Sequence, residues 1–253
     1  MGWDPWFNYL CFWNKPDTGI ETNTMEFKNF TYLILLIVSI TDPLIQSFDK
    51  RKRTAEKIKY IIPAILITAA FFLVWDINFT EAKIWTFNTE YTLGKSIKGL
   101  PIEEWLFFLV VPYCCIFIYE IVKVDLEKYE YPNFFMALSL VLIVGFGLIG
   151  YLFRQQRYTF PAFLLPAIYL GYILIRNKFK HHLTKFYCSY FISLIPFLIV
   201  YGILAALPLV TYNPDHILNI RVLNIPVEDF TYFFLLLLMM ITIYEFLKER
   251  KFY

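Results

Sequence analysis

Seven apolar stretches of membrane length constrain the fold of this chain more than any other feature. A helix needs about 20 mostly apolar residues to cross the hydrocarbon core of a bilayer. The chain is 58% apolar, whereas an average soluble domain has roughly 45–50%. We therefore expect an all-α membrane protein with about seven transmembrane helices. The stretches are Phe27–Gln46, Ile58–Trp75, Trp105–Val122, Phe134–Phe153, Phe160–Ile175, Phe186–Leu207 and Val227–Leu247.

Basic residues predict the orientation of these helices. Segments Phe48–Lys57 and Arg176–Lys185 carry five and four Lys or Arg residues, and the C-terminal tail adds three more. The alternate loops, 76–102 and 208–226, carry three and one. Because cytoplasmic loops are enriched in Lys and Arg, we expect the N-terminus outside and the C-terminus in the cytoplasm, in a cytoplasmic (inner) membrane. The formal net charge of +2 gives no reason to expect a nucleic-acid partner.

One segment of the chain recurs near its end. Thr86–Glu120 and Thr211–Glu245 align without gaps at an offset of 125, with ten identical pairs in 35 positions. Because an even number of crossings separates the two helices, the repeat is parallel about an axis along the membrane normal. We therefore divide the chain into an N-terminal extension (1–26), a first repeat of helices one to three (27–125), a linking fourth helix (126–155) and a second repeat of helices five to seven (156–253).

Each copy of the repeat opens a helix with proline and two acidic residues. The motifs are Pro101-Ile102-Glu103-Glu104 and Pro226-Val227-Glu228-Asp229. Proline and acids also suit an ordinary helix N-terminus, but acids next to membrane-length runs are costly and mark function. A carboxyl group in apolar surroundings holds its proton and can act as a general acid. The candidate catalytic residues are therefore Glu103, Glu104, Glu228 and Asp229.

Adjacent helical residues point about 100° apart, so we expect one acid of each pair to face the interior. We favour Glu103 and Glu228, which are identical across the repeat. Glu120 and Glu245 lie 17 residues further on, about 25 Å along a helix. We expect them at the cytoplasmic ends, paired with Lys123 or Lys248.

Three other sequence patterns do not indicate a functional site. Gly145–Gly150 spells GxGxxG inside an apolar run without the strand and acid of a dinucleotide site, so it favours close helix packing. The three histidines have no partners at metal-ligand spacing, so we expect no metal. Cys11, Cys114, Cys115 and Cys188 form no CxxC pair and are interpreted as core residues.

The aromatic residues of the first 25 positions are of a type found at membrane interfaces.

Several motifs together resemble a known family. The motifs in the first half are Pro43–Asp49, Val74-Trp75-Asp76, Ile84-Trp85-Thr86-Phe87-Asn88, Leu100–Phe108 and Phe117–Glu120, and those in the second half are Tyr212–Leu218 and Pro226–Phe230. Asp76 itself is ambiguous between a loop residue and a site residue. The chain resembles the membrane-integral lycopene cyclases, which are related to the cyclase domain of fungal bifunctional phytoene synthase/lycopene cyclases. The chain is similar to the fused form of the two-chain bacterial lycopene beta-cyclases. The resemblance implies cyclisation of lycopene ends to β-ionone rings, giving γ-carotene and then β-carotene, by a non-redox isomerase (an intramolecular lyase) that needs no cofactor.

For this reaction, the duplicated placement of the acids predicts roles for the candidate residues. Glu103 or Glu228 would be the general acid, and Glu104 or Asp229 the base or proton relay. Partners would be lycopene or a related acyclic carotenoid, the lipid bilayer and other carotenoid enzymes. Residues for substrate contact, aromatic ones among them able to stabilise a carbocation, are Asn88, Trp105, Phe107, Phe108, Asn213, Phe230, Tyr232 and Phe233.

Other functions fit the sequence less well. A rhodopsin needs a lysine inside its last helix, and run 227–247 has none. A transporter with parallel repeats would carry acids near the bilayer midplane, whereas these acids sit at helix ends. A purely structural subunit leaves the duplicated acids unexplained. A cyclase for a different acyclic carotenoid, one or two rings in the product, and one or two active pockets all remain open.

Overall fold

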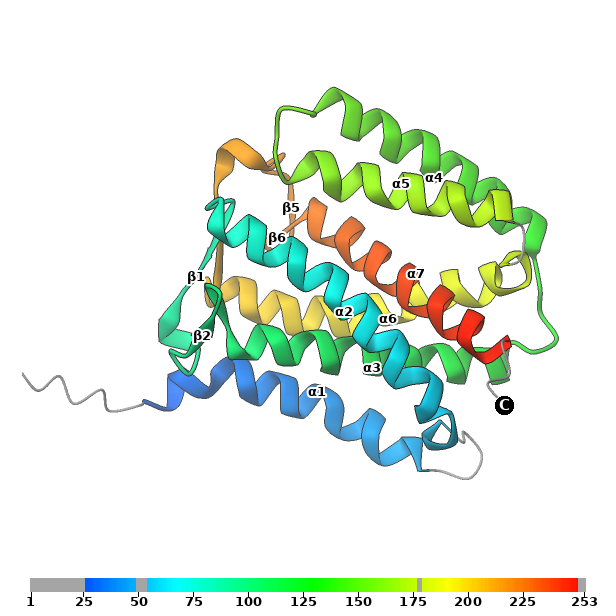
Figure 1. The fold of residues 1–253 in the computed structure, drawn as a ribbon, viewed down its shortest axis with the longest axis horizontal. Coiled ribbons are helices and arrows are strands. Elements are labelled where there is room, and N and C mark those ends of the chain that lie inside the picture. The colour runs from blue at the N-terminus through cyan, green and yellow to red at the C-terminus, as the bar shows by residue number, and fades with distance from the viewer. Residues whose placement is uncertain (1–25, 49–53, 177–178, 250–253) are drawn as a thin grey trace, which may run out of the picture.

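The computed structural model describes residues 26–48, 54–176 and 179–249, so the first 25 residues, with Cys11, and the basic run Lys50–Arg53 lie outside the described part. Within that part, seven helices are long and apolar enough to cross a membrane (Figure 1). They are α1 (Thr31–Ser47), α2 (Ile58–Glu81), α3 (Ile102–Asp125), α4 (Pro132–Leu152), α5 (Thr159–Arg176), α6 (Leu183–Ala206) and α7 (Val227–Glu249). The predicted fold class, an all-α multi-pass membrane protein, is confirmed.

Helices α3 and α7 run in the same direction through the bundle (Figure 1). Helix α1 packs on α3, and α5 packs on α7. The second helix of each half contacts the last helix of the other half: α2 packs on α7, and α6 packs on α3. This exchange follows the two-fold relationship expected of a parallel repeat. Helix α4 lies outside this core and packs mainly on α5.

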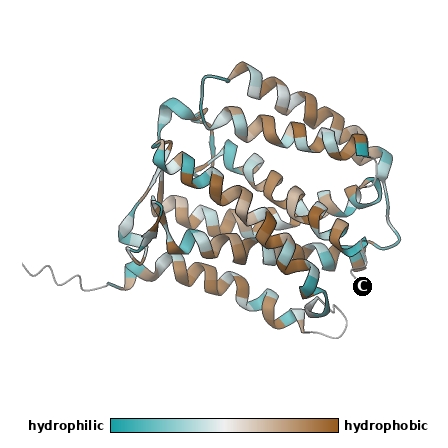
Figure 2. Ribbon diagram, viewed as in Figure 1, coloured by the Kyte–Doolittle hydropathy of each residue, from teal (hydrophilic) through white to brown (hydrophobic). Residues whose placement is uncertain are grey.

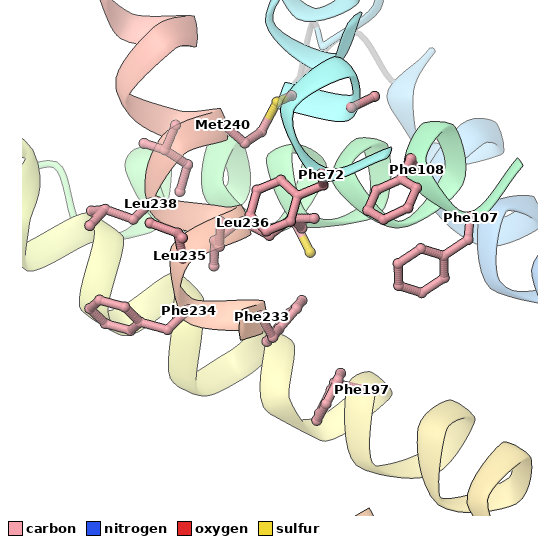
Figure 3. Close-up of a cluster of buried hydrophobic side chains, with 14 of the residues drawn as sticks. Phe72, Phe107, Phe108, Phe197, Phe233, Phe234, Leu235, Leu236, Leu238 and Met240 are labelled. Atoms are coloured by element: carbon pink, nitrogen blue, oxygen red, sulfur yellow. The ribbon is translucent and has the colours of Figure 1, made fainter. Parts of the chain in front are cut away.

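The surface of the bundle is apolar where a membrane would contact it. Large apolar side chains on the outer helices are exposed, including Val141 and Val144 of α4 and Ile175 of α5, and Figure 2 shows hydrophobic residues along all the helices. The core between α2, α3, α6 and α7 is packed with Phe and Leu side chains such as Phe72, Phe108 and Leu238 (Figure 3).

Short strands cap one end of the bundle. β1 (Trp85–Phe87) pairs with β4 (Val210–Tyr212), and Thr86 lies opposite Thr211, its own counterpart in the repeat. β2 (Ser96–Ile97) pairs with β3 (Leu100–Pro101), and β5 (Arg221–Val222) pairs with β6 (Ile225–Pro226). Each hairpin leads directly into α3 or α7, so the cap fixes the starts of the helices that carry the acids.

The turns of the two hairpins share one conformation. Lys98 and Gly99 have φ of 51° and 78°, and Leu223 and Asn224 have φ of 50° and 67°. Positive φ at both central residues is the geometry of a type I′ turn, which matches the twist of the flanking strands. The backbone of the two halves is therefore equivalent even where the residues differ.

Helix boundaries and one motif can be compared with the predictions. Helix α2 continues past the predicted end at Trp75 to Glu81, and α3 begins at Ile102 and not at Trp105. Hydropathy falls at the acids, but backbone hydrogen bonding continues through them. Within the glycine motif, a Cβ added at Gly145 or Gly147 would meet nothing within 4 Å, and one at Gly150 would stand 3.4 Å from the backbone of α5, so the predicted close packing is seen at Gly150 alone of the three.

Candidate functional site

All four acids at the starts of α3 and α7 are buried. Glu103 and Glu228 are fully buried, and Glu104 and Asp229 are exposed by only 6% and 4%. The prediction that one acid of each pair faces the interior is wrong. Both central helices are enclosed by their neighbours, and the strand cap covers their first turns, so neither side of the helix start reaches a surface.

Glu103 and Glu228 hold equivalent loops. Glu103 Oε1 accepts the backbone N–H of Leu93 at 2.6 Å, and Glu228 Oε1 accepts that of Leu218 at 2.7 Å. Both bonds span ten residues, and Thr159 also donates to Glu228 Oε1 at 2.6 Å. The second carboxyl oxygen of each glutamate has no hydrogen-bond partner in the described structure. The identity of these two residues across the repeat therefore has a structural explanation.

Three other carboxyl groups line one cavity beneath the strand cap, which we call the acid chamber. Asp76 of α2, Glu104 of α3 and Asp229 of α7 contribute to it, and neither Glu103 nor Glu228 does. The empty space within it is about 350 Å³. The remaining lining is mostly aromatic and consists of Trp85, Phe87, Phe107, Tyr158, Tyr201, Val210, Tyr212 and Tyr232.

Tyrosine hydroxyls donate hydrogen bonds to each acid of the chamber. Tyr32 donates to Glu104 Oε2 at 2.8 Å, and Tyr232 donates to Asp76 Oδ1 at 2.7 Å. Asp229 accepts two such bonds, one on each oxygen, at 2.6 and 2.7 Å. The two donors to Asp229 are Tyr158 and Tyr212. Among the residues that the structure describes, no tyrosine donates to the other oxygen of Glu104 or of Asp76.

The donors to Asp229 lie outside the membrane-spanning helices. Burial raises the pKa of Tyr158 and Tyr212 well above the usual value of 10.0, and the nearby Asp229 carboxylate raises it further. Both hydroxyls therefore stay protonated. Arg221 lines an adjoining cavity together with Asp229, and its guanidinium carbon lies 5.8 Å from the centre of the Tyr212 ring.

The arrangement of the chamber suits proton transfer to an apolar molecule. The lining contains three carboxyl groups and neither lysine nor arginine. Because neighbouring carboxylates repel one another, such a cluster favours keeping a proton on at least one member. A protonated carboxyl group can donate, and an ionised one can accept. The surrounding aromatic rings present faces that attract a cation.

The structure separates the residues predicted to contact a substrate. Phe107 and Tyr232 line the acid chamber, and Phe233 lines an apolar groove next to it. Phe108 stacks on Phe72 at 6.2 Å, and Phe230 meets Phe197 edge-on at 5.5 Å. The other three predicted residues lie elsewhere.

Asn88 and Asn213 each begin a short 3-10 turn, and each accepts a hydrogen bond from a backbone N–H two residues on. They shape equivalent turns in the strand cap. Trp105 is half-buried, and its indole N–H has no hydrogen-bond partner in the described structure.

Sequence reasoning left one acid of the chamber ambiguous between a loop residue and a site residue, and it missed most of the tyrosines. Asp76 falls one residue past the predicted end of its helix, yet it is a buried acid within a membrane-length helix, and an acid in that position is a signal of function. Tyr32, Tyr158 and Tyr201 carry no sequence signal, because only the tertiary fold brings them to the acids. Tyr212 lies in one of the family motifs, but its contact with Asp229 could not be predicted from it.

The far ends of α3 and α7 carry a second charged cluster. Glu245 binds Lys123 at 2.5 Å, and Glu120 binds Lys57, lies 3.6 Å from Lys248 and accepts a bond from Tyr244. The predicted pairing of these glutamates with Lys123 and Lys248 is confirmed, and both pairs cross between α3 and α7.

A comparison with protein families matches most of the chain. The family model described as lycopene cyclase matches residues 29–122 and 155–247. The two matched segments contain the two acid motifs, and the gap between them contains α4. No curated protein and no solved structure matches the chain.

Proposed function

The chain belongs to the lycopene cyclase family, and we propose that it converts the linear ends of lycopene to β-ionone rings, giving γ-carotene and then β-carotene. The observation that carries the proposal is the acid chamber, where Asp76, Glu104 and Asp229 share a buried, aromatic-lined cavity. Membership of this family implies an enzyme that catalyses cyclisation. The chamber supplies the groups that such a reaction needs.

The proposed reaction begins and ends with a proton. A carboxylic acid protonates the terminal double bond of the substrate, which leaves a tertiary carbocation. The electron pair of the neighbouring double bond attacks this cation and closes a six-membered ring, moving the positive charge onto the ring. Loss of a ring proton to a carboxylate forms the ring double bond. One proton enters and one leaves, so the product is an isomer of the substrate.

We assign the acid role to Glu104 and the base role to Asp229. Both oxygens of Asp229 accept tyrosine hydrogen bonds, an arrangement that stabilises the ionised form. Tyr32 contacts only one oxygen of Glu104, so the other oxygen can carry the proton. This assignment departs from the sequence-based preference for Glu103 and Glu228, whose Oε1 atoms are committed to loop N–H groups.

Aromatic side chains would stabilise the cation between these steps. Trp85, Phe87 and Phe107 line the chamber together with the tyrosines. A cation over a desolvated aromatic face gains up to about 2 kcal/mol. The same rings keep water from capturing the carbocation as an alcohol. We assign Asp76, held by Tyr232, as the third proton carrier, able to return the proton to Glu104 after each turnover.

We further propose that the strand cap faces the non-cytoplasmic side. Lys57, Arg176 and Lys180 lie at the opposite end of the bundle, where α2 begins and α5 ends, and positive residues favour the cytoplasmic side. The chamber then lies near the outer interface of the membrane, within reach of a substrate dissolved in the bilayer.

Expression in a bacterium that accumulates lycopene tests the proposed function. We expect the wild-type protein to convert lycopene to pigments of identical mass that carry one or two β-rings, identified by chromatography and mass spectrometry. The matched control is the double variant Glu104→Gln with Asp229→Asn, at equal abundance in the membrane, which should leave lycopene unchanged. Lycopene left unconverted by abundant wild-type protein would contradict the proposal, and conversion of a different acyclic carotenoid in its place would correct the substrate.

A further inference from the structure

An apolar groove adjoins the acid chamber along the membrane-facing side of α1, α3 and α6. It contains about 850 Å³ of empty space, part of which is open to the outside, and its lining includes Val38, Val111, Cys115, Ser193 and Val200. Phe107 and Tyr201 line both the groove and the chamber, so the two spaces are neighbours. Val38 and Ile199, which also line the groove, are 66% and 60% exposed. The groove therefore opens toward the lipid.

The repeat shows what the equivalent place in the other half contains. Helix α6 begins and ends 125 residues after the corresponding ends of α2, and α7 begins 125 residues after the start of α3. Residues 125 positions apart on these helices are therefore counterparts. Several groove residues on α3 and α6 have larger counterparts, including the following three. Val111, Cys115 and Val200 correspond to Leu236, Met240 and Trp75.

These larger side chains are packed into the core. Met240, Leu236 and Trp75 are exposed by 0%, 1% and 7%. Phe72 stacks on Trp75 at 5.9 Å and on Phe108 at 6.2 Å. In Figure 3, Phe72 lies between Phe108 and the α7 side chains around Leu236.

The boundary between groove and chamber also differs between the halves. On the groove side, the rings of Phe107 and Tyr201 meet at 6.2 Å. Their counterparts are Tyr232 and Asp76, which are joined by a hydrogen bond of 2.7 Å. Two ring side chains therefore stand between the groove and the chamber in one half, whereas a tyrosine–aspartate hydrogen bond occupies the equivalent positions in the other half.

We propose that the polyene arm of the substrate binds only in the groove between α1, α3 and α6, so that the duplicated fold has a single substrate site. This inference rests on the proposed function. The acids of both halves share one chamber, so one end of the polyene reacts at a time. The second end can reach the chamber only after the molecule leaves the groove and returns in the opposite direction.

Exchanging side chains between the halves tests the groove. The variant Val111→Leu with Cys115→Met gives the groove the side chains of the closed half. Because one methylene in an apolar pocket changes discrimination by roughly 10–200-fold, we expect lycopene conversion to fall at least tenfold. The matched control, Leu236→Val with Met240→Cys, makes the reverse exchange in the closed half. Smaller side chains in the closed half weaken core packing and so lower the stability of this control variant. Its conversion of lycopene per folded protein should therefore stay within about threefold of wild type.

A time course provides a readout that does not depend on folding of the variants. With wild-type protein in vesicles and lycopene in large excess, a single site predicts that free monocyclic product accumulates first and that any bicyclic product follows after a lag. Bicyclic product from the first turnovers, without a monocyclic phase, would overturn the single site.

The two proposals fail in different ways. Wild-type vesicles that leave lycopene unchanged would overturn the proposed function and, with it, the groove. Wild-type conversion that the Val111→Leu with Cys115→Met variant retains in full would overturn the groove assignment alone. Amounts of folded protein are compared by size-exclusion chromatography in detergent.

Discussion

Glu104 and Asp229 occupy equivalent positions at the starts of α3 and α7, yet Glu104 accepts one tyrosine hydrogen bond and Asp229 accepts two. The difference comes from Tyr212, whose counterpart in the first half is Phe87. A duplicated chain would begin with two equal acids. In the proposed assignment, this additional hydroxyl favours the ionised form of Asp229, so that Asp229 accepts the proton that Glu104 does not.

Removing the hydroxyl of Tyr212 should slow the reaction. Tyr212→Phe deletes the bond to Asp229 Oδ2, and a hydrogen bond to a charged group contributes about 1.5–3 kcal/mol. We expect the cyclisation rate to fall by roughly 10–100-fold. Tyr187→Phe is the control, because its hydroxyl bonds Ser139 between α4 and α6. Equal activity of the two variants would show that Asp229 needs no second donor.

The buried tyrosines also predict how the protein responds to alkali. The pKa values of Tyr158 and Tyr212 are raised above 10.0 by burial, so both hydroxyls remain donors below that pH. Their contribution to stability is complete below the unfolded value and is lost as pH rises through the folded value. We therefore expect no loss of activity from tyrosine ionisation below about pH 10, and a fall in thermal stability above it. Tyrosinate absorbance that appears together with loss of activity near pH 9 would contradict this.

The charged cluster at the far ends of α3 and α7 should contribute to the stability of the protein and not to the rate of cyclisation. Lys123→Met leaves Glu245, which is 4% exposed, without its lysine. Breaking a fully buried pair costs about 3–5 kcal/mol, and Lys123 is partly exposed, so we expect about 2 kcal/mol, or roughly 4–8 °C in melting temperature.

The double variant Lys123→Met with Glu245→Met should recover part of that loss, because no buried charge is left unpaired. Thermal unfolding in detergent measures both variants. The cyclisation rate per folded protein should stay constant, since the cluster lies about 25 Å from the chamber. A slower reaction in folded Lys123→Met would show that the two ends are coupled.

The seven helices could be predicted because hydropathy and length determine what can cross a membrane. The repeat was visible because polar residues and proline recur at one offset. The sequence left Asp76 ambiguous between a loop and a site for a physical reason: a drop in hydropathy looks like a helix end, whereas α2 continues to Glu81 through backbone hydrogen bonds.

The proposed division of roles among the acids could not be predicted from the sequence. Glu103 and Glu228 are identical because both hold a loop N–H ten residues away, and identity alone does not distinguish this role from catalysis. The tyrosines of the chamber come from α1, α6, α7 and the segments that precede α5 and η6 (Pro214–His216). No periodicity along the chain relates them.

Comparing two neighbouring glutamates tests the central assignment most directly. Glu103→Gln keeps an oxygen that can accept the N–H of Leu93, so cyclisation by folded protein should stay within about threefold of wild type. Glu104→Gln cannot donate a proton of the required acidity, and loss of a general acid costs about 10²–10⁴-fold. We predict near-normal β-ring formation from lycopene in Glu103→Gln membranes and a loss of at least 10²-fold in Glu104→Gln membranes. The opposite pattern, an inactive Glu103→Gln and an active Glu104→Gln, would contradict the account.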